Sequence, residues 1–260
     1  MDLKLKDKII IVTGGAKGIG EAISKTLATE GALPVIVGRN EEDNIVTVEA
    51  IRKVGFNAHQ VKADLSVAAE CESSVKKILE TFGQIDGLVN NAGTNDGVSL
   101  EHGNYEEFMK SLHRTLVHYY LMAHFALPAL IKSKGAILNI GSKTAETGQG
   151  GTSGYAASNG GRNALTREWA VELLKYSIRV NAVIVAECFT PQYKTWIKTL
   201  TNHEEKLKEI QEKIPFENRF TKAEEIADMV AFLLSERASH ITGQLVHVDG
   251  GYVHLDRALL

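Results

Sequence analysis

Cysteine is scarce in this chain, which has only two among its 260 residues. Cys71 and Cys188 lie far apart and show no metal-ligand spacing. Such usage is typical of a reducing compartment and argues against a disulfide framework. We therefore expect two buried or idle thiols, and no metal site.

A strong excess of charge is also missing, because 29 lysines and arginines stand against 32 aspartates and glutamates, for a formal net charge of -3. The chain thus has no broad basic field for nucleic acid phosphates or anionic lipid. Hydrophobic residues at 44% and charged residues at 23% are typical of soluble globular domains. This balance argues against nucleic acid and membrane partners and favours a small molecule.

Long hydrophobic runs are absent as well. The N-terminal stretch MDLKLKDKIIIVTGG carries charges and then a short apolar run, too brief for a signal peptide or a membrane span. The sequence shows no internal repeat, low-complexity stretch or Pro/Gly/Ser-rich linker. We therefore expect a single domain over residues 1–260, in the cytoplasm.

What is present is an alternation of short runs rich in Val and Ile with longer segments of helical period. This pattern is typical of repeated βαβ units around a buried parallel sheet. It predicts strands at residues 9–12, 34–37, 59–62, 87–90, 136–140, 179–184 and 245–248. It predicts helices at residues 20–29, 41–54, 69–82, 105–131, 153–176 and 223–234. The predicted fold class is α/β, a doubly wound, Rossmann-type parallel sheet of about seven strands with helices on both faces.

One segment interrupts this rhythm. Residues 191–215 are polar and helical in pattern, with Trp196 and Ile197 in a charged surround. The insertion lies where a lid over a site would be placed, and a surface helical hairpin is the alternative. We expect a substrate lid.

A glycine-rich turn, TGGAKGIG, runs from Thr13 to Gly20 directly after the first predicted strand and opens a helix. Backbone N–H groups and the positive end of a helix dipole then face one small concavity. A Cβ would block the tight turn and the approach of a pyrophosphate to the backbone. Glycine-rich turns also occur for purely steric reasons, but the position after the first strand favours phosphate binding.

A second small-residue turn, Asn90-Asn91-Ala92-Gly93, ends the fourth predicted strand, at the sheet edge where open α/β folds bind ligands. A capped turn is the alternative.

The second strand ends in Gly38-Arg39, where an NAD-selective site usually has an acidic residue for the ribose hydroxyls. Arg39 and Lys17 could instead meet a 2′-phosphate, so the pattern favours NADP, with NAD possible.

Ser142 follows the fifth predicted strand, and Tyr155 lies thirteen residues later at the start of a helical segment. With the glycine turn, NNAG and a late Val248-Asp249-Gly250-Gly251, this pair makes the chain resemble the short-chain dehydrogenase/reductase family over essentially its full length. The stretches SKTAETGQGGTSGY, ALTREWAVEL, RVNAVIVAE and VDGGYVHLDRAL are similar to bacterial L-fucose dehydrogenases, sugar-oxidising members of that family.

The resemblance implies a mechanism and two departures from it. In the family, the tyrosine is the general acid/base and the serine hydrogen-bonds the substrate oxygen, which are roles for Tyr155 and Ser142. A tyrosine has an ordinary pKa of about 10, so acting as a base requires a stabilised phenolate. The family's lysine falls here on Asn159, an amide that can bond the nicotinamide ribose but carries no charge. The family's relay asparagine falls on Thr115, when Pro128 fixes the register.

Three interpretations follow. In the first, which we favour, the enzyme is active, and the charge of the oxidised nicotinamide, with Lys143, His113 or His118, takes over part of the missing electrostatic role. In the second, the chain is a pseudoenzyme that binds nucleotide as a sensor or an assembly partner. In the third, Tyr155 supports dehydration or epimerisation through a transiently oxidised substrate.

Polar residues are dense around the predicted pocket: Asn95, Asp96, Lys143, Glu146, Gln149, Glu187, Tyr193 and Trp196. Sugar hydroxyls need paired donors and acceptors, and an aromatic such as Trp196 can cover the apolar face of a sugar ring. Each residue alone is equally consistent with a solvated loop. As a cluster they predict a sugar substrate, and we assign its binding to Lys143, Glu146, Gln149, Glu187 and Trp196.

The resemblance also implies a set of cofactor contacts and an assembly. The expected cofactor-binding residues are Gly14, Lys17, Gly18, Ile19, Gly20, Arg39, Asp64, Leu65, Asn91, Ala92, Gly93, Tyr155, Asn159, Cys188 and Thr190. We expect a homotetramer whose main dimer contact uses the helices at 105–131 and 153–176. The tail residues His254, Asp256 and Arg257 are expected to fold onto a neighbouring subunit.

Overall fold

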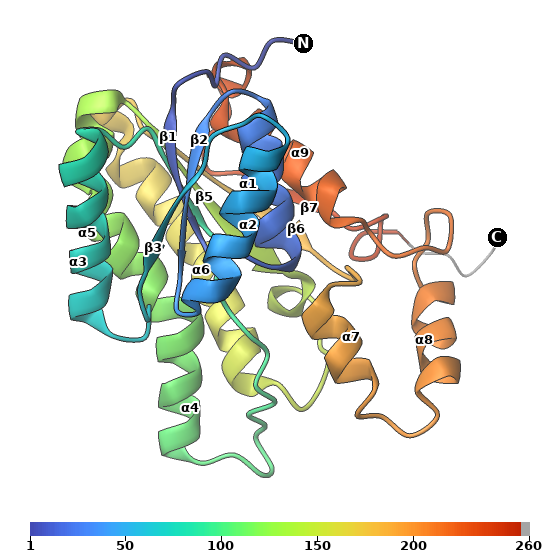
Figure 1. Cartoon of the computed structure of the whole chain (residues 1–260). Helices are drawn as coiled ribbons and strands as arrows, with labels where there is room; N and C mark the ends of the chain where they lie inside the picture. The colour runs from blue at the N-terminus through green and yellow to red at the C-terminus, as the bar shows by residue number, and fades with distance from the viewer. Residues whose placement is uncertain (256–260) are drawn as a thin grey trace.

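The computed structural model describes residues 1–255 and contains one parallel sheet with the strand order β3-β2-β1-β4-β5-β6-β7. Figure 1 shows this twisted sheet between two layers of helices. The strands are β1 (Ile9–Thr13), β2 (Leu33–Gly38), β3 (His59–Lys62), β4 (Gly87–Asn90), β5 (Ala136–Ser142), β6 (Arg179–Val185) and β7 (Leu245–Val248). The α/β, Rossmann-type fold class predicted from the sequence is confirmed.

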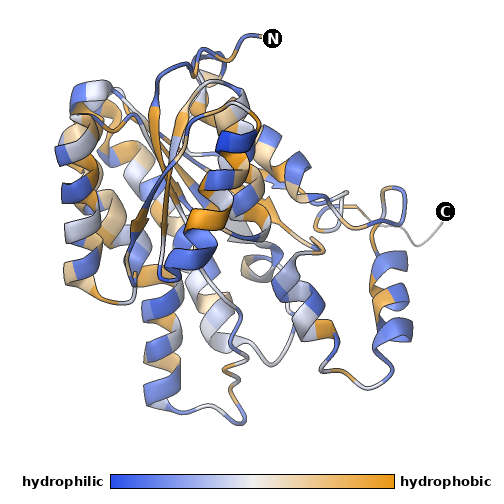
Figure 2. Cartoon of the chain, viewed as in Figure 1, coloured by the Kyte–Doolittle hydropathy of each residue, from blue (hydrophilic) through white to orange (hydrophobic). Residues whose placement is uncertain are grey.

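The two faces of the sheet are covered by different helices. One face packs against α3 (Ala68–Phe82), α5 (His118–Ser133) and α6 (Ser153–Glu172), and the other against α1 (Gly18–Thr29), α2 (Glu41–Lys53) and α9 (Ala223–Leu234). Successive side chains of a strand point to opposite faces. Ile9 and Ile11 of β1 therefore enter one core cluster, and Ile10 and Val12 the other. Figure 2 shows apolar residues concentrated in the strands between the helices.

The strand order also places the functional edge. The chain moves outward from β1 to β3, returns to β4 beside β1, and then moves outward to β7. A crevice forms at such a reversal, outside the carboxyl ends of the strands. Thr13, Asn90, Ser142 and Val185 end their strands at this same edge.

The helix predicted over residues 105–131 is present and runs without a break from residue 105 to residue 133, but it contains a π-helical turn that the sequence did not predict. It consists of α4 (Tyr105–Leu112), a π-helical turn η1 (His113–Val117) and α5. A π turn widens a helix by one residue and frees a carbonyl from the regular ladder. The carbonyl of Thr115 accepts hydrogen bonds from Arg162 of α6 instead. The π turn therefore coincides with a tertiary contact to α6.

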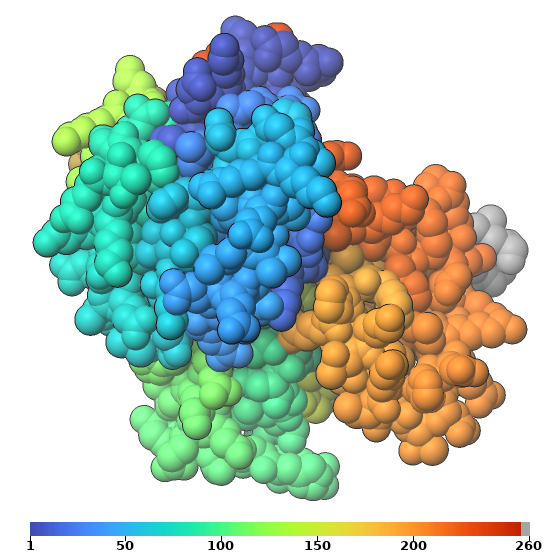
Figure 3. Space-filling view, in the orientation of Figure 1, coloured from blue at the N-terminus to red at the C-terminus, as the bar shows by residue number. Residues whose placement is uncertain are grey.

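The other predicted elements agree with the structure apart from their ends. The helix predicted to reach residue 176 ends at Glu172, and a 3-10 turn, η3 (Leu174–Tyr176), follows it. Residues 191–215 contain α7 (Pro191–Ile197) and α8 (His203–Glu212), which stand beside the carboxyl edge of the sheet (Figures 1 and 3). α8 has no buried residue.

Within residues 1–255, none of the helices combines the length and the apolar character that a membrane crossing requires.

Candidate active site

The glycine turn is shaped by contacts that leave no room for a side chain. Gly14 has a φ of +64°, which favours glycine. A Cβ on Gly20 would lie 2.1 Å from the carbonyl oxygen of Gly14 and 2.6 Å from Nδ2 of Asn91. The amide of Glu21 donates to the carbonyl of Lys17 (3.3 Å), so the preceding amides lie at the open end of α1. This cradle of backbone amides suits a pyrophosphate.

Hydrogen bonds lock the NNAG turn onto the glycine turn. The hydroxyl oxygen of Thr13 accepts from the amides of Asn91 (2.9 Å) and Ala92 (3.1 Å). The Asn91 side chain donates to the carbonyls of Thr13 (2.9 Å) and Gly14 (3.3 Å). The structure thus brings together the two turns that the sequence predicted to hold the cofactor, in one rigid surface between β1 and β4.

Beyond this surface, the ends of β2 and β3 place Arg39 near Asp64. Arg39 is exposed, and Asp64 is half-buried. Hydrogen bonds from Ser66 hold the pKa of the Asp64 carboxyl below its usual range, with a further contribution from the charge of Arg39. Lys17 is already paired with Asp43 (2.6 Å). Of the two predicted 2′-phosphate ligands, Arg39 is therefore the one whose charge is more available to a phosphate.

Three further predicted cofactor residues differ in what they can offer. Leu65 is buried in the core beside α3. Cys188 is buried beside α9, where burial raises the pKa of its thiol to about 12, so its backbone alone is left for a cofactor. Thr190 caps α7 by accepting from the amide of Tyr193 (3.2 Å), and its side chain lies 3.3 Å from where a Cβ of Gly18 would stand. The root of the predicted lid therefore touches the glycine turn.

Ser142 and Tyr155 lie at the same edge, on β5 and on the first turn of α6. The hydroxyl oxygen of Ser142 accepts from the amide (3.3 Å) and the hydroxyl (3.2 Å) of Thr144. Both bonds use the oxygen as acceptor, so the Ser142 proton can be donated to a substrate oxygen. Tyr155 is half-buried.

Asn159 is fully engaged within the protein. It is buried, its amide donates to the carbonyl of Tyr155 (2.9 Å), and its side-chain oxygen accepts from Arg162 (3.0 Å). Because Asn159 is 0% exposed, a contact with a ribose would require its side chain to be uncovered. Thr115 is equally buried, and its hydroxyl donates to the carbonyl of Thr94 (3.4 Å).

Arg162 is the principal site residue that the sequence analysis missed. It is 3% exposed, and it donates to the carbonyls of Thr115 (3.0 Å) and Ile140 (3.0 Å). Its guanidinium carbon lies 4.1 Å from the centre of the Tyr119 ring. The signal in the sequence was an arginine seven residues after Tyr155, on the same helical face, in a stretch of small residues.

The cations first considered for the missing charge do not supply it. Burial, and then the charge of Arg162, lowers the pKa of His118 to about 3, so the hypothesis that His118 contributes charge is wrong. His113 is exposed on the π turn. Lys143 is buried and ion-paired with Glu187, with its ammonium 4.0 Å from the centre of the Tyr252 ring. The charge of Lys143 is therefore already engaged by a neighbouring acid.

The remaining predicted substrate residues form two groups. Glu146 pairs with Nε2 of His247 (3.1 Å), and the ring of His254 packs edge-on against His247. The ligand atoms of these three residues lie within 4.8 Å of one another, close enough to share a metal ion. Trp196 is 41% exposed and contacts Tyr193 edge-on, whereas Gln149 is exposed.

Tyr193 is half-buried and lies beside Glu187. Burial, followed by the nearby charge of Glu187, raises the pKa of Tyr193 above its usual range. This part of the site thus combines the Lys143–Glu187 ion pair, one further acidic side chain, Glu146, and several aromatic rings. Asp256 and Arg257 of the predicted tail contact lie outside the described residues.

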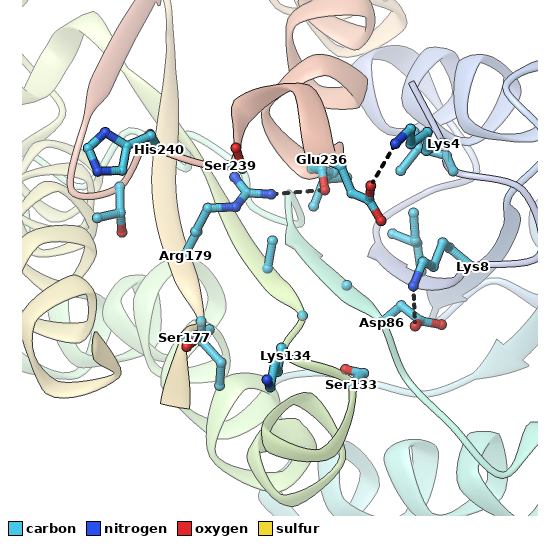
Figure 4. A pocket seen from close by; sticks show the side chains of 18 of the residues that line it. Lys4, Lys8, Asp86, Ser133, Lys134, Ser177, Arg179, Glu236, Ser239 and His240 are labelled. Carbon is cyan, nitrogen blue, oxygen red and sulfur yellow. Dashed lines mark hydrogen bonds and ion pairs between the residues drawn. The ribbon is translucent and has the colours of Figure 1, made fainter. Parts of the chain in front are cut away.

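A large cavity of about 680 Å³ lies elsewhere, at the amino ends of β1, β4, β5 and β6 (Figure 4). Two of its lysines are paired with acids, Lys8 with Asp86 (3.2 Å) and Lys4 with Glu236 (3.4 Å). Ser142 and Tyr155 are at the opposite edge of the sheet, so this cavity is separate from the candidate active site.

Comparisons with known proteins cover nearly the whole chain. A family model described as enoyl-(acyl carrier protein) reductase matches residues 14–253. The sorbitol-6-phosphate 2-dehydrogenase of Klebsiella pneumoniae is 35% identical, over 96% of this chain and 97% of its own. The 3-oxoacyl-[acyl-carrier-protein] reductase FabG of Aquifex aeolicus is also 35% identical, over 96% and 99%. The crystal structure of Cj0485 dehydrogenase is 45% identical, with a TM-score of 0.94, over 100% of this chain and 99% of that one.

The two curated relatives are named for different substrates and are equally similar to this chain. Similarity alone therefore does not select a substrate, and the closeness to L-fucose dehydrogenases stays a prediction. The side chains that surround Ser142 and Tyr155 are the remaining guide to the substrate.

Proposed function

Because the chain belongs to the short-chain dehydrogenase/reductase family of NAD(P)-dependent oxidoreductases, we propose that it oxidises a hydroxyl group of a sugar such as L-fucose. The proposed site of reaction is the anomeric or a secondary hydroxyl. The products are the corresponding carbonyl compound and the reduced cofactor.

The buried pair of Lys143 and Glu187 is the observation that carries the sugar proposal. Removing two opposite charges from water is costly, and hydrophobic side chains would fill a fatty-acyl pocket at lower cost. Beside Tyr193 and Tyr252, the pair offers charged donors and acceptors next to aromatic faces. A polyol presents hydroxyls and apolar ring faces in the same combination. The relative that acts on sorbitol 6-phosphate supports this choice.

The cofactor would be held by this chain's two locked turns. The amides at the start of α1 would meet the pyrophosphate, and the NNAG turn and Thr190 would flank the nicotinamide half. Arg39 favours NADP over NAD, because it can pair with a 2′-phosphate and cannot accept bonds from ribose hydroxyls. When bound there, a nicotinamide dinucleotide supplies the hydride acceptor.

Tyr155 and Ser142 perform the proton chemistry in this proposal. The Ser142 hydroxyl donates to the oxygen of the substrate hydroxyl and orients it. The Tyr155 phenolate takes the hydroxyl proton as the hydrogen on the same carbon leaves as hydride. The C–H and O–H bonds break, and a C=O bond forms.

Two parts of the proposal concern the surroundings of the site. α7 and α8 act as a lid, since α7 begins at the cofactor cradle and carries Tyr193 and Trp196 over the pocket.

The chain assembles as a homotetramer through the α4–α6 face. The exposed apolar side chains of Tyr105, Tyr120 and Val171 on these helices support that assembly.

The test of substrate class is a parallel assay. Oxidation of aldoses, including L-fucose, and of sorbitol 6-phosphate is measured with NADP and with NAD, and reduction of a 3-oxoacyl thioester is measured with both reduced cofactors. The proposal predicts turnover with an aldose and a preference for NADP. Turnover confined to the thioester would overturn the assignment to sugars.

A further inference from the structure

Asn159 leaves the proposed base without the cation that the family places four residues after its tyrosine. We propose that Arg162 supplies this charge from one helical turn further along α6 and stabilises the Tyr155 phenolate. This inference rests on the proposed function and assigns Arg162 as an electrostatic positioning residue of the same site.

The first support is placement on the helix. Residues at i, i+4 and i+7 of an α-helix share one face, and Tyr155, Asn159 and Arg162 have this spacing. Asn159 joins the other two, because it donates to the carbonyl of Tyr155 (2.9 Å) and accepts from Arg162 (3.0 Å). The face that carries the base therefore also carries the cation.

The second support is that the guanidinium has no counter-ion. Its hydrogen-bond partners are the carbonyls of Thr115 and Ile140 and the side-chain oxygen of Asn159, all of them neutral. An arginine stays protonated in proteins, and a buried charge is costly unless it is paired. The carbonyls satisfy its hydrogen bonds and leave its positive charge uncancelled.

The third support is the contact between the Arg162 side chain and the NNAG turn. A Cβ on Gly93 would lie 2.7 Å from Nη2 of Arg162, so the guanidinium edge packs directly against the NNAG backbone. A side chain at this position would force the guanidinium to shift. The charge therefore lies against the turn that the proposed function assigns to the nicotinamide half of the cofactor, on the α6 face that carries Tyr155.

Charged and titratable groups on the elements packed around α6 do not offset this charge. His118 and Tyr119 of α5 are buried and neutral, and the charge of Arg162 contributes to the low pKa of His118 after burial. Lys143 is paired with Glu187, and Glu146 with His247. Arg114 of η1 and the charged residues of α4 are exposed. Within residues 1–255, Arg162 is thus the unpaired buried cation of this region.

The first experiment measures cofactor binding, without turnover, in the parent protein, Arg162→Met and Arg162→Lys. The oxidised nicotinamide ring carries one more positive charge than the reduced ring, so a nearby cation weakens binding of the oxidised form selectively. We expect Arg162→Met to lower the ratio of Kd for oxidised to reduced NADP by about fivefold or more. Arg162→Lys should keep the parent ratio. A purely structural role would change both constants together.

The second experiment measures the pH dependence of sugar oxidation in the same three proteins. Loss of a nearby cation disfavours the phenolate, so the rising limb of the rate should move to higher pH by roughly one unit in Arg162→Met. Arg162→Lys should stay near the parent, and thermal unfolding confirms that each variant is folded.

An unchanged Kd ratio and an unchanged pH profile in folded Arg162→Met would overturn the role of Arg162 and leave the proposed function standing. Absence of turnover in the parent on every substrate would overturn the proposed function. The binding ratio would still decide whether the charge acts at the nicotinamide.

Discussion

The nucleotide-binding region and the chemical region of this molecule follow different rules. Around β1 and β4, the turn residues are fixed by steric contact, as at Gly20, where a Cβ would stand 2.1 Å from a carbonyl oxygen. Around β5, α6 and β6, the family's lysine is replaced by Asn159, and a different residue, Arg162, holds a buried charge. A close backbone contact requires a small residue at one particular position. A positive charge that acts on Tyr155 can instead be supplied from more than one position in the sequence.

Removing the proposed base alone should affect the chemical region and leave the nucleotide-binding region unchanged. Tyr155→Phe should lower kcat for sugar oxidation by about a thousandfold, within the range for loss of a general base. Cofactor affinity should change less than about twofold, because the locked turns are untouched. Steady-state rates and cofactor fluorescence titration check the two halves of this prediction, and an undiminished rate would contradict the mechanism.

A second test asks whether charge pairing controls the stability of the chemical region. Lys143→Met should reduce the free energy of unfolding by about 3 kcal/mol, since it leaves the buried carboxylate of Glu187 without its cation. The double variant Lys143→Met/Glu187→Leu should recover more than half of that loss. Denaturant unfolding measures both, and a double variant less stable than the single would show that the pair itself stabilises the fold.

A third test concerns the neutral histidine beside Arg162. The pKa of His118 falls from 6.5 to about 3 on folding, so below pH 6.5 the unfolded chain binds a proton that the folded chain does not. Stability should therefore fall as pH is lowered, by about 2 kcal/mol between pH 6.5 and pH 5. His118→Gln should lack this part of the slope. Equal slopes for the two proteins would show that His118 is charged in the folded state.

The smallest expected effect belongs to the nucleotide-binding region. Arg39→Asp should shift the preference from NADP toward NAD by about tenfold in kcat/KM, because a carboxylate repels a 2′-phosphate and accepts from ribose hydroxyls. The rate at saturating cofactor should stay near that of the parent. An unchanged preference would remove Arg39 from the cofactor site.

The fold was predictable because its determinants are local. Runs such as residues 9–12 and 136–140 are buried on both faces, and a parallel strand buried in this way reads as a continuous apolar run. The glycine and NNAG turns could also be predicted, because each is a short run of adjacent residues in the sequence. The π turn at Thr115 was not predicted, and it coincides with a hydrogen bond from Arg162, 47 residues away in the sequence.

The side chains of the chemical region were only partly predictable. Lys143 and Glu187 were both expected in the pocket, but their pairing depends on the approach of β5 to β6. Arg162 was overlooked because a surface arginine and a buried one look the same in a sequence. The low pKa of His118 also follows from tertiary burial.

The central claim is that the cation serving Tyr155 has moved along one face of α6, and moving it back tests this most directly. The measurement is the rate of sugar oxidation against pH in Arg162→Met and in Arg162→Met/Asn159→Lys. Our account predicts that Asn159→Lys returns the rising limb to the parent's pH range and restores most of the rate. Superimposable profiles for the two variants, with both folded, would contradict it.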